Sequence, residues 1–204
     1  GPTIQRSSER ALERGVNTNF VFEAVKKFRE QDNDTPVVLM GYLNPIEMRG
    51  LDAYAGQAVQ AGVDGVLLVD LPPEEAAPMR VAFNRHGLHL ISLAAPTTTP
   101  ERLHRLATES QGYLYYVSFA GVTGASGIDV NEVLTKAGEL RKQAKVPVMI
   151  GFGIKDAASA KSLAPAADGI VIGSALVEAL AASQHPTATA EAFLKPIRDA
   201  LDGL

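Results

Sequence analysis

Short apolar runs alternate with amphipathic segments along almost the whole chain of 204 residues. The apolar runs recur roughly every 25 to 30 residues, which is typical of βα units. Strands of a parallel sheet are buried on both faces, so they read as continuous apolar runs rather than alternating ones. On this basis six strands are predicted, at Pro36–Met40, Gly65–Val69, His89–Leu93, Gly112–Val117, Pro147–Ile150 and Gly169–Ile172.

Apolar residues at helical spacing fill the gaps between these strands. Thr18 and Asn19 are candidate caps for the first of the helices, and Asp129 is placed to cap a later one. The last helix contains Pro196, which is expected to kink or split it. Helices are predicted over Phe20–Phe28, Leu51–Ala61, Glu74–Arg85, Pro100–Thr108, Val130–Leu140, Asp156–Leu163, Ser174–Ala182 and Thr187–Leu201.

The chain contains no linker, low-complexity tract or charge block, so residues 1–204 are predicted to form a single domain. It opens with Gly1-Pro2-Thr3-Ile4, which reads as a loop running into a helix over Gln5–Leu12 rather than as a strand. Six strands also fall short of the eight of a closed barrel, which needs about 250 residues. These features favour the α/β class and a (β/α)8 TIM barrel with six β/α units remaining after an N-terminal truncation. An open, doubly wound six-stranded sheet is the alternative.

The composition excludes several classes of function. A net charge of −4 argues against nucleic-acid binding, which needs a basic face. No apolar run approaches the length of about 20 residues that spans a bilayer, and no secretory leader opens the chain, so a cytoplasmic location without membrane contact is expected. There is no cysteine, and the four histidines are scattered, so no metal site is expected.

Glycine-rich segments follow three of the predicted strands. They are Ser118–Gly124, Gly151–Ile154 and Gly173–Ala175, the last of which leads into a helix. Glycine lets the backbone approach a ligand closely, and the free N–H groups of a helix N-terminus favour an anion. Because the carboxyl ends of parallel strands meet at one rim of a barrel, these segments together predict a phosphate site, although each alone is also consistent with a tight turn.

Two further segments follow the first two strands, at 40–45 and 70–75. Asp70 stands at the carboxyl end of a strand, where it could act as a general base, orient its loop or contact a partner. Ser118 has no histidine placed to activate it, so a hydrolase triad is rejected. Apolar and aromatic side chains at the strand ends predict a pocket wall, with ordinary barrel core as the alternative; they are Met40, Leu67, Val69, Leu93 and Tyr115.

Taken together, these segments resemble the tryptophan synthase alpha subunit family, in register from the first residue to the last. The most specific matches are Tyr42-Leu43-Asn44-Pro45 and Gly121-Val122-Thr123-Gly124. The resemblance implies a lyase of tryptophan biosynthesis that cleaves indole-3-glycerol phosphate to indole and glyceraldehyde 3-phosphate in a retro-aldol reaction. It implies no cofactor in this subunit. It also implies a partner, the beta subunit, which carries pyridoxal phosphate and completes an alpha2beta2 heterotetramer.

The resemblance also implies roles for individual residues. Those implied to hold the substrate phosphate are Gly124, Phe152, Gly153, Gly173 and Ser174. Those implied to line the substrate pocket are Met40, Tyr42, Leu67, Val69, Leu93, Tyr115 and Thr123. The loops at Tyr42–Ile46 and Leu71–Pro73 are implied to face the beta subunit, with Asn44, Pro45 and Pro72 at the interface.

The chain departs from the family pattern in its catalytic groups. The family uses a Glu on its second strand and an Asp that belongs immediately before the opening Gly1-Pro2, and neither is present. No catalytic residue is therefore assigned, and the chain alone is predicted to be inactive. Phe119 also replaces an Arg found in many members. The alternatives are a non-catalytic fragment that binds phosphate or docks on the beta subunit, and another phosphate-binding barrel, such as an isomerase.

Overall fold

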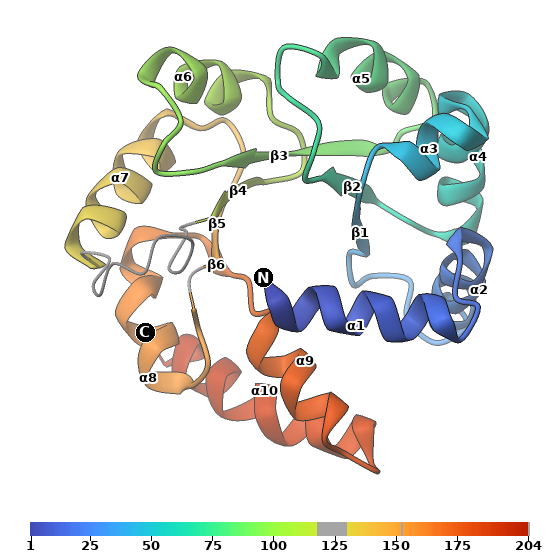
Figure 1. Ribbon diagram of the computed structural model, residues 1–204. Coiled ribbons are helices and arrows are strands. Elements are labelled where there is room, and N and C mark those ends of the chain that lie inside the picture. Colours follow the sequence, from blue (N-terminus) through green and yellow to red (C-terminus); the bar gives the residue numbers. More distant parts are fainter. Residues whose placement is uncertain (118–129, 152, 204) are drawn as a thin grey trace.

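The computed structural model describes residues 1–117, 130–151 and 153–203. Six parallel strands form one sheet, in which each strand pairs with the next along the chain. The sheet curves around a centre and the helices lie mostly outside it (Figure 1). The strands are β1 (Val38–Gly41), β2 (Gly65–Leu68), β3 (His89–Ala94), β4 (Leu114–Val117), β5 (Val148–Gly151) and β6 (Gly169–Ile170).

The helices alternate with these strands. They are α1 (Pro2–Glu13), α2 (Thr18–Arg29), α3 (Asn44–Arg49), α4 (Leu51–Ala61), α5 (Ala76–Arg85), α6 (Pro100–Glu109), α7 (Val130–Gln143), α8 (Ala157–Leu163), the 3-10 turn η1 (Ala164–Ala166), α9 (Ser174–Ala181) and α10 (Pro186–Asp202). Strand order follows chain order without reversal, whereas a doubly wound sheet reverses at a switch point. The expected α/β class and TIM-barrel family are thus confirmed, and the doubly wound alternative is wrong.

All six predicted strands are present, with ends shifted by at most two residues. The cap prediction for α2 is wrong, because Asn17 is the N-cap: its side chain accepts a hydrogen bond from Phe20 N–H at 3.1 Å. The segment after β1, expected as a loop, contains α3. Helix α10 continues through Pro196 without a split, and the next residue, Ile197, is buried in the core.

The two faces of the sheet differ in what covers them. One face packs under the helices and supplies core residues of every strand: Leu39, Val66, Leu68, Leu90, Ala94, Leu114, Tyr116, Val148, Ile150 and Ile170. Side chains alternate along a strand, so the residues between these point to the concave inner face. The inner face is where a barrel of this family places its ligand-facing residues near the carboxyl ends of the strands.

The same clamp holds the amino ends of two strands. Asp64 precedes β2, accepts a hydrogen bond from Val37 N–H at 2.7 Å and pairs with Arg29 at 2.8 Å. Asp168 precedes β6 and does the same for Val148 N–H, at 2.9 Å, and for Arg141, at 2.8 Å. Each aspartate thereby fixes its own strand against the start of the neighbouring one.

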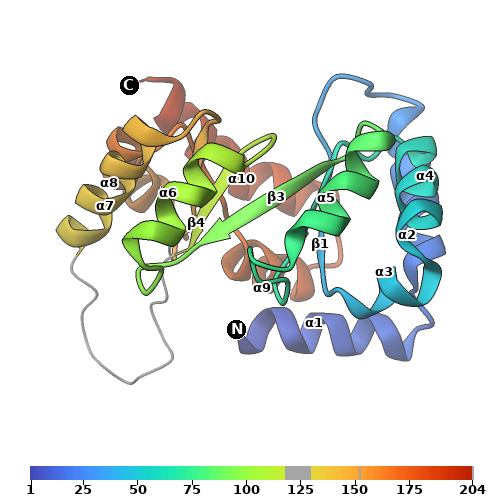
Figure 2. The ribbon, with the colours of Figure 1, turned by 90° about the horizontal axis from the view of Figure 1, so that it is seen from above.

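Helix α1 lies across the space between β6 and β1, at the rim where the carboxyl ends of the strands meet (Figures 1 and 2). Thr3 of α1 donates a hydrogen bond to the carboxylate of Glu178 in α9. A Cβ atom added to Gly173, which follows β6, would lie 3.9 Å from Cδ1 of Ile4. Within the described residues β1 and β6 each pair with one strand only, so the sheet has two open edges.

Candidate functional site

An apolar wall lies on the inner face of the sheet. Met40 is paired with Leu67 across β1 and β2, and Leu93 is paired with Tyr115 across β3 and β4. Cross-strand partners point to the same face. Leu67 is only 2% exposed, whereas Val69, two residues nearer the rim, is 38% exposed and Met40, on the edge strand β1, is 63% exposed. The wall is therefore more open towards the rim and towards the free edge at β1. The structure therefore brings these five predicted pocket residues together on one surface.

Strand register adds two residues to the wall that sequence reasoning missed. Ile91 is the partner of Leu67, and Met149 is the partner of Tyr115. The available signal was the apolar character of both residues at every second position of a predicted strand. Tyr42 lies just beyond β1 and is 64% exposed, at the open end of the wall.

The side chain of Tyr115 lies over Gly151. A Cβ atom added to Gly151 would be 2.0 Å from the tyrosine hydroxyl oxygen, so only glycine leaves room for this ring. Burial raises the pKa of Tyr115, and the nearby Tyr113 raises it further. The phenol is therefore held neutral and can donate a hydrogen bond at the edge of the wall.

Two of the three glycine-rich segments lie side by side at the carboxyl-end rim. Gly153 follows β5 and has a φ of +48°, in the left-handed region that favours glycine. Gly173 follows the paired strand β6 and is the N-cap of α9, with Ser174 as its first residue. Gly153, Gly173 and Ser174 are exposed, so their backbone groups can be reached by a ligand. Gly124, Thr123 and Phe152 lie outside the described residues.

The residues expected to meet a partner also reach this rim. Asn44 and Pro45 form the first turn of α3 and are exposed. Pro72 is exposed in the loop after β2. The two segments are joined directly, because Oδ1 of Asp70 accepts a hydrogen bond from Leu43 N–H at 2.9 Å.

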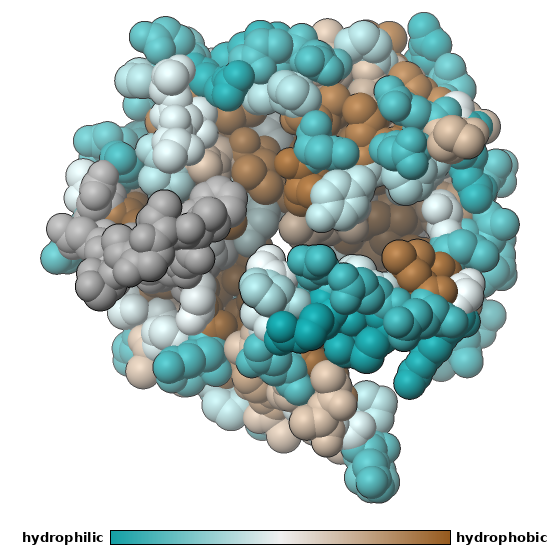
Figure 3. Space-filling model, in the orientation of Figure 1, coloured by the Kyte–Doolittle hydropathy of each residue, from teal (hydrophilic) through white to brown (hydrophobic). Residues whose placement is uncertain are grey.

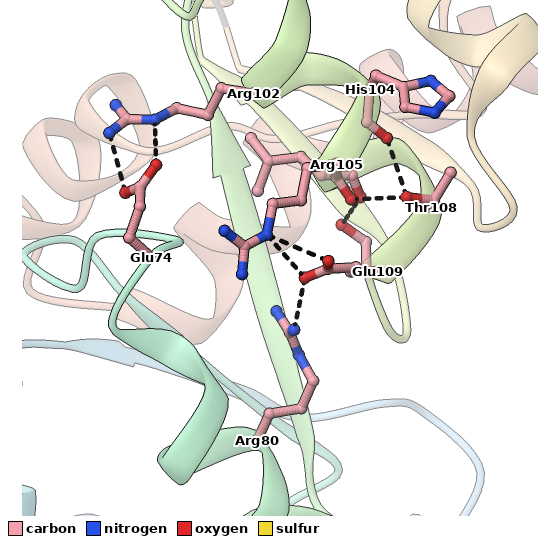
Figure 4. A network of polar contacts seen from close by, with 9 residues as sticks. Glu74, Arg80, Arg102, His104, Arg105, Thr108 and Glu109 are labelled. Carbon is pink, nitrogen blue, oxygen red and sulfur yellow. Dashed lines mark hydrogen bonds and ion pairs between the residues drawn. The ribbon is translucent and has the colours of Figure 1, made fainter.

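A groove of about 410 Å³ opens between the ends of β2 and β3 and the helices α5 and α6. In Figure 3 apolar residues surround the hollow near the centre of the view, which the curved sheet encloses. Val69, Ile91 and Leu93 belong to both the groove and the wall. At the rim of the groove Arg102 donates two hydrogen bonds of 2.9 Å to the carboxylate of Glu74 (Figure 4). This hydrogen bonding lowers the pKa of Glu74.

A second ion-pair group bridges α5 and α6. Glu109 accepts from Arg80 at 2.9 Å and from Arg105 at 3.1 Å (Figure 4). The carboxylates of Glu74 and Glu109 are thus both engaged by arginines. Within the described ranges, no group of three or more His, Cys, Asp or Glu side chains is placed to hold a metal ion. None of the helices there is both long and apolar enough to cross a membrane.

Comparison with known proteins gives a consistent result. The sequence model of the family described as "Tryptophan synthase alpha chain" matches residues 1–200. The tryptophan synthase alpha chain of Xanthomonas axonopodis pv. citri is 60% identical over 206 residues, which cover 99% of this chain and 77% of that protein. The crystal structure of the tryptophan synthase alpha chain from Legionella pneumophila superposes with a TM-score of 0.91 at 42% identity, covering 100% of this chain and 77% of the other. A structure of the tryptophan synthase a2b2 complex from Pyrococcus furiosus gives a TM-score of 0.86 at 33% identity, covering 100% and 81%.

Proposed function

The chain belongs to the tryptophan synthase alpha chain family, lyases of tryptophan biosynthesis, and from this premise we propose that its inner face binds indole-3-glycerol phosphate. The indole ring lies against the apolar wall of Leu67, Leu93 and Tyr115. The phosphate lies at the turns containing Gly153 and Gly173. The observation that carries the proposal is the position of this wall and these turns at one rim of the sheet.

The reaction proposed for the site is a retro-aldol cleavage. The bond between the indole ring carbon and the glycerol phosphate side chain breaks when the ring carbon gains a proton and the side-chain hydroxyl loses one. Indole and glyceraldehyde 3-phosphate are the products. No cofactor is needed for these proton transfers. In the part of the chain that the structure describes, the rim carboxylates of Asp70 and Glu74 already accept hydrogen bonds from Leu43 and Arg102. We therefore assign no catalytic acid or base, and propose that the chain alone is inactive.

An assay of indole release by the 204-residue chain tests the inactivity directly. We expect no release above the uncatalysed background, because the described residues that form the wall include no carboxylate. Ordinary turnover would contradict this part of the proposal and leave the binding site untouched.

Calorimetry with glycerol phosphate and, separately, with indole tests the binding site. Ser174→Glu places a negative charge at the N-terminus of α9, so it should weaken glycerol phosphate binding at least tenfold or so while indole binding stays the same. Ala181→Glu adds the same charge at the far end of the same helix and serves as the control. Equal affinity of both variants for glycerol phosphate would show that the anion site lies elsewhere.

The proposed partner is a tryptophan synthase beta subunit, which would carry pyridoxal phosphate and receive the indole. The support is the a2b2 assembly of the Pyrococcus furiosus relative and the exposure of Asn44, Pro45 and Pro72 at the rim. A non-catalytic docking module is the second candidate, favoured by the engaged rim carboxylates. Binding of the beta subunit without any binding of indole or glycerol phosphate would favour this second candidate.

A further inference from the structure

Strands β2 and β3 separate towards their carboxyl ends. Gly65 to Leu67 of β2 pair with His89 to Ile91 of β3, and the following residues of β3 pair with β4 instead. The groove of about 410 Å³ opens at this divergence, between the two strand ends and the helices α5 and α6. Ligand pockets of proteins begin at about 300 Å³, so the groove is large enough for a small molecule.

One edge of the Arg80 guanidinium is unused in this groove. Arg80 belongs to α5, lines the groove and has a side chain that is only 18% exposed. Its Nη1 donates to the carboxylate of Glu109 in α6 at 2.9 Å (Figure 4). Its Nε is buried without a hydrogen-bond partner, and Nη2 has no partner among the described residues. Nε–H and Nη2–H together form an edge that can donate to both oxygens of one carboxylate.

A buried hydroxyl lines the same groove. Ser92 of β3 is 8% exposed and lies between the helix-facing residues Leu90 and Ala94. No hydrogen bond engages its hydroxyl in the described part of the chain. Ser110 is equally buried, but its hydroxyl donates to the carbonyl oxygen of Leu106. Buried polar groups are nearly always hydrogen-bonded, so the unused groups of Arg80 and Ser92 indicate a ligand that supplies the missing acceptor.

The remaining lining limits the character and the charge of such a ligand. Much of the groove is apolar, through Leu68, Leu71, Leu90, Ile91, Leu93 and Leu106. The arginines and carboxylates in and beside the groove balance in number; they are Arg80, Arg102 and Arg105, and Asp70, Glu74 and Glu109. A site without net charge accommodates one negative charge beside an unused guanidinium edge more readily than the two of a phosphate group.

We propose that this groove binds a small monocarboxylate with an apolar body, such as a branched aliphatic acid. The carboxylate accepts hydrogen bonds from Nε and Nη2 of Arg80 and from the hydroxyl of Ser92, and the aliphatic body lies against the leucines. The groove borders the proposed substrate wall, but its polar groups lie on the opposite, helix-facing side of the sheet. Binding there does not depend on the proposed substrate.

Titration of the chain with 4-methylpentanoate, followed by NMR, tests the site. The neutral control of the same shape is 4-methylpentanamide. We expect a Kd on the order of 1 mM or below for the acid and at least about tenfold weaker binding of the amide. Inorganic phosphate should not displace the acid. The proposal is overturned if the acid does not bind, if acid and amide bind equally, or if phosphate competes with the acid.

Arg80→Met keeps an unbranched side chain and removes the guanidinium. It should weaken binding of the acid at least about tenfold and abolish the preference for acid over amide. Arg105→Met is the matched control, because Arg105 also pairs with Glu109 but does not line the groove. It should change the affinity for the acid by less than about twofold. Equal losses in the two variants would assign the effect to the ion pairs of Glu109 and overturn the proposal.

The hydroxyl is tested by Ser92→Ala, with Ser110→Ala as its control. Ser92→Ala should weaken binding of the acid about threefold or more, whereas Ser110→Ala should leave it unchanged. In case Arg80→Met does not fold, Arg80→Lys keeps the charge beside Glu109 but lacks the planar edge. It should reduce the preference for acid over amide at least about threefold. Unchanged binding of the acid in both Arg80→Lys and Ser92→Ala would overturn the proposal.

Indole binding separates the groove from the substrate wall. The affinity for indole should be the same in the parent, Arg80→Met and Ser92→Ala, because both side chains lie on the other side of the sheet. A loss of indole binding in parallel with the acid would place the acid at the wall and overturn the assignment to the groove. Absence of indole binding in the unaltered chain would contradict the proposed function and leave the groove site intact.

Discussion

The aromatic ring of Tyr115 occupies the space that a side chain at Gly151 would fill. The aromatic atoms of Tyr115 lie 2.5 and 2.6 Å from where a Cβ of residue 151 would be, and the hydroxyl lies closer still. A comparable approach occurs between Met149 and Gly169, where the added Cβ would be 2.4 Å from the sulfur. The two positions differ in how easily the neighbouring side chain can move away. The half-buried ring of Tyr115 is rigid, whereas the side chain of Met149 has three rotatable bonds.

Gly151→Ala should therefore destabilise the fold by about 1–3 kcal/mol, because the ring of Tyr115 must leave the wall. Gly169→Ala should cost clearly less, since Met149 can change its rotamer. Urea denaturation measures both. In a Tyr115→Ala background the cost of Gly151→Ala should nearly vanish, and an unchanged cost there would show that the clash is not with the ring.

Asp156 should make the stability of the fold depend on pH. Hydrogen bonds from the backbone N–H and then from the hydroxyl of Ser159 lower the pKa of Asp156 from its ordinary value of 3.8. The backbone bond is one half of the capping box of α8, and the other half is the bond that Asp156 N–H donates to the Ser159 hydroxyl oxygen. A lowered folded-state pKa gives stability that is present above the unfolded value and is lost as the pH falls through the folded value. Asp156→Ala should thus lower the free energy of unfolding at neutral pH, and its difference from the parent should shrink below about pH 3.8.

Denaturation curves at a series of pH values provide the measurement. Asp34→Ala, which changes an exposed aspartate outside any helix cap, is the control and should show little effect at any pH. A difference between Asp156→Ala and the parent that stays constant into strong acid would argue against the capping carboxylate as its source.

For single residues, the sequence predicted which types of side chain form the wall, but it did not predict which residues they contact. The apolar residues of the wall were predictable because strand ends could be recognised. Ile91 and Met149 were missed because cross-strand register depends on how neighbouring strands are aligned. The cap of α2 was placed wrongly because Asn17, Thr18 and Asn19 are all good cap residues, and only backbone geometry distinguishes them.

Among the elements, the aspartate clamps are the devices that set strand position. Asp64 and Asp168 each combine a bond from a backbone N–H with an ion pair to an arginine of the helix that precedes the neighbouring strand. The backbone bond satisfies a donor at the start of a strand, where the ladder has not yet begun. The arginine holds the carboxylate in place.

Asp168→Ala should cost about 1–2 kcal/mol, because Val148 N–H loses its acceptor and Arg141 its partner. Arg141→Ala should cost less, about 1 kcal/mol or below, because the ion pair is partly exposed and the backbone bond remains. Urea denaturation of the two variants gives the comparison. Equal costs, or a larger cost for Arg141→Ala, would contradict the assignment of the main role to the backbone bond.

Element positions were largely predictable, since the strands and most helices follow from apolar periodicity and helix caps. Helix α3 was not, because its six residues are too few to show a period. The continuity of α10 was also missed. Proline fits within this helix because tertiary packing around the buried Ile197 outweighs the local preference.

For the whole molecule, the core falls into two clusters that meet along β3. One is built on α2, α4, β2 and α5, and the other on α6, β4, α7, β5 and α8. The ion pairs that α6 makes with α5 and with Glu74, which precedes α5, bridge the two clusters on the outside (Figure 4). The sheet remains open at β1 and β6, with an apolar inner face next to the opening.

Open sheet edges next to exposed apolar side chains favour self-association. The melting temperature of the isolated chain should therefore rise with protein concentration, and sedimentation should show a growing share of dimers or larger species. Met40→Lys, which places a charge on the edge strand β1, should weaken this dependence. Val59→Lys on α4 adds the same charge away from the edges and should not. A melting temperature independent of concentration would count against association through the edges.

The contact of α1 with α9 has a consequence for the order in which the molecule assembles. Thr3 and Glu178 are separated by 175 positions, and α1 has no buried residue of its own. Closing so long a loop costs chain entropy, and α1 gains no stabilising contact in return until β6 and α9 have folded. Helix α1 can therefore pack against α9 only after these elements are in place. Helix α1 is thus expected to dock last during folding, and to detach first in local unfolding of the native protein.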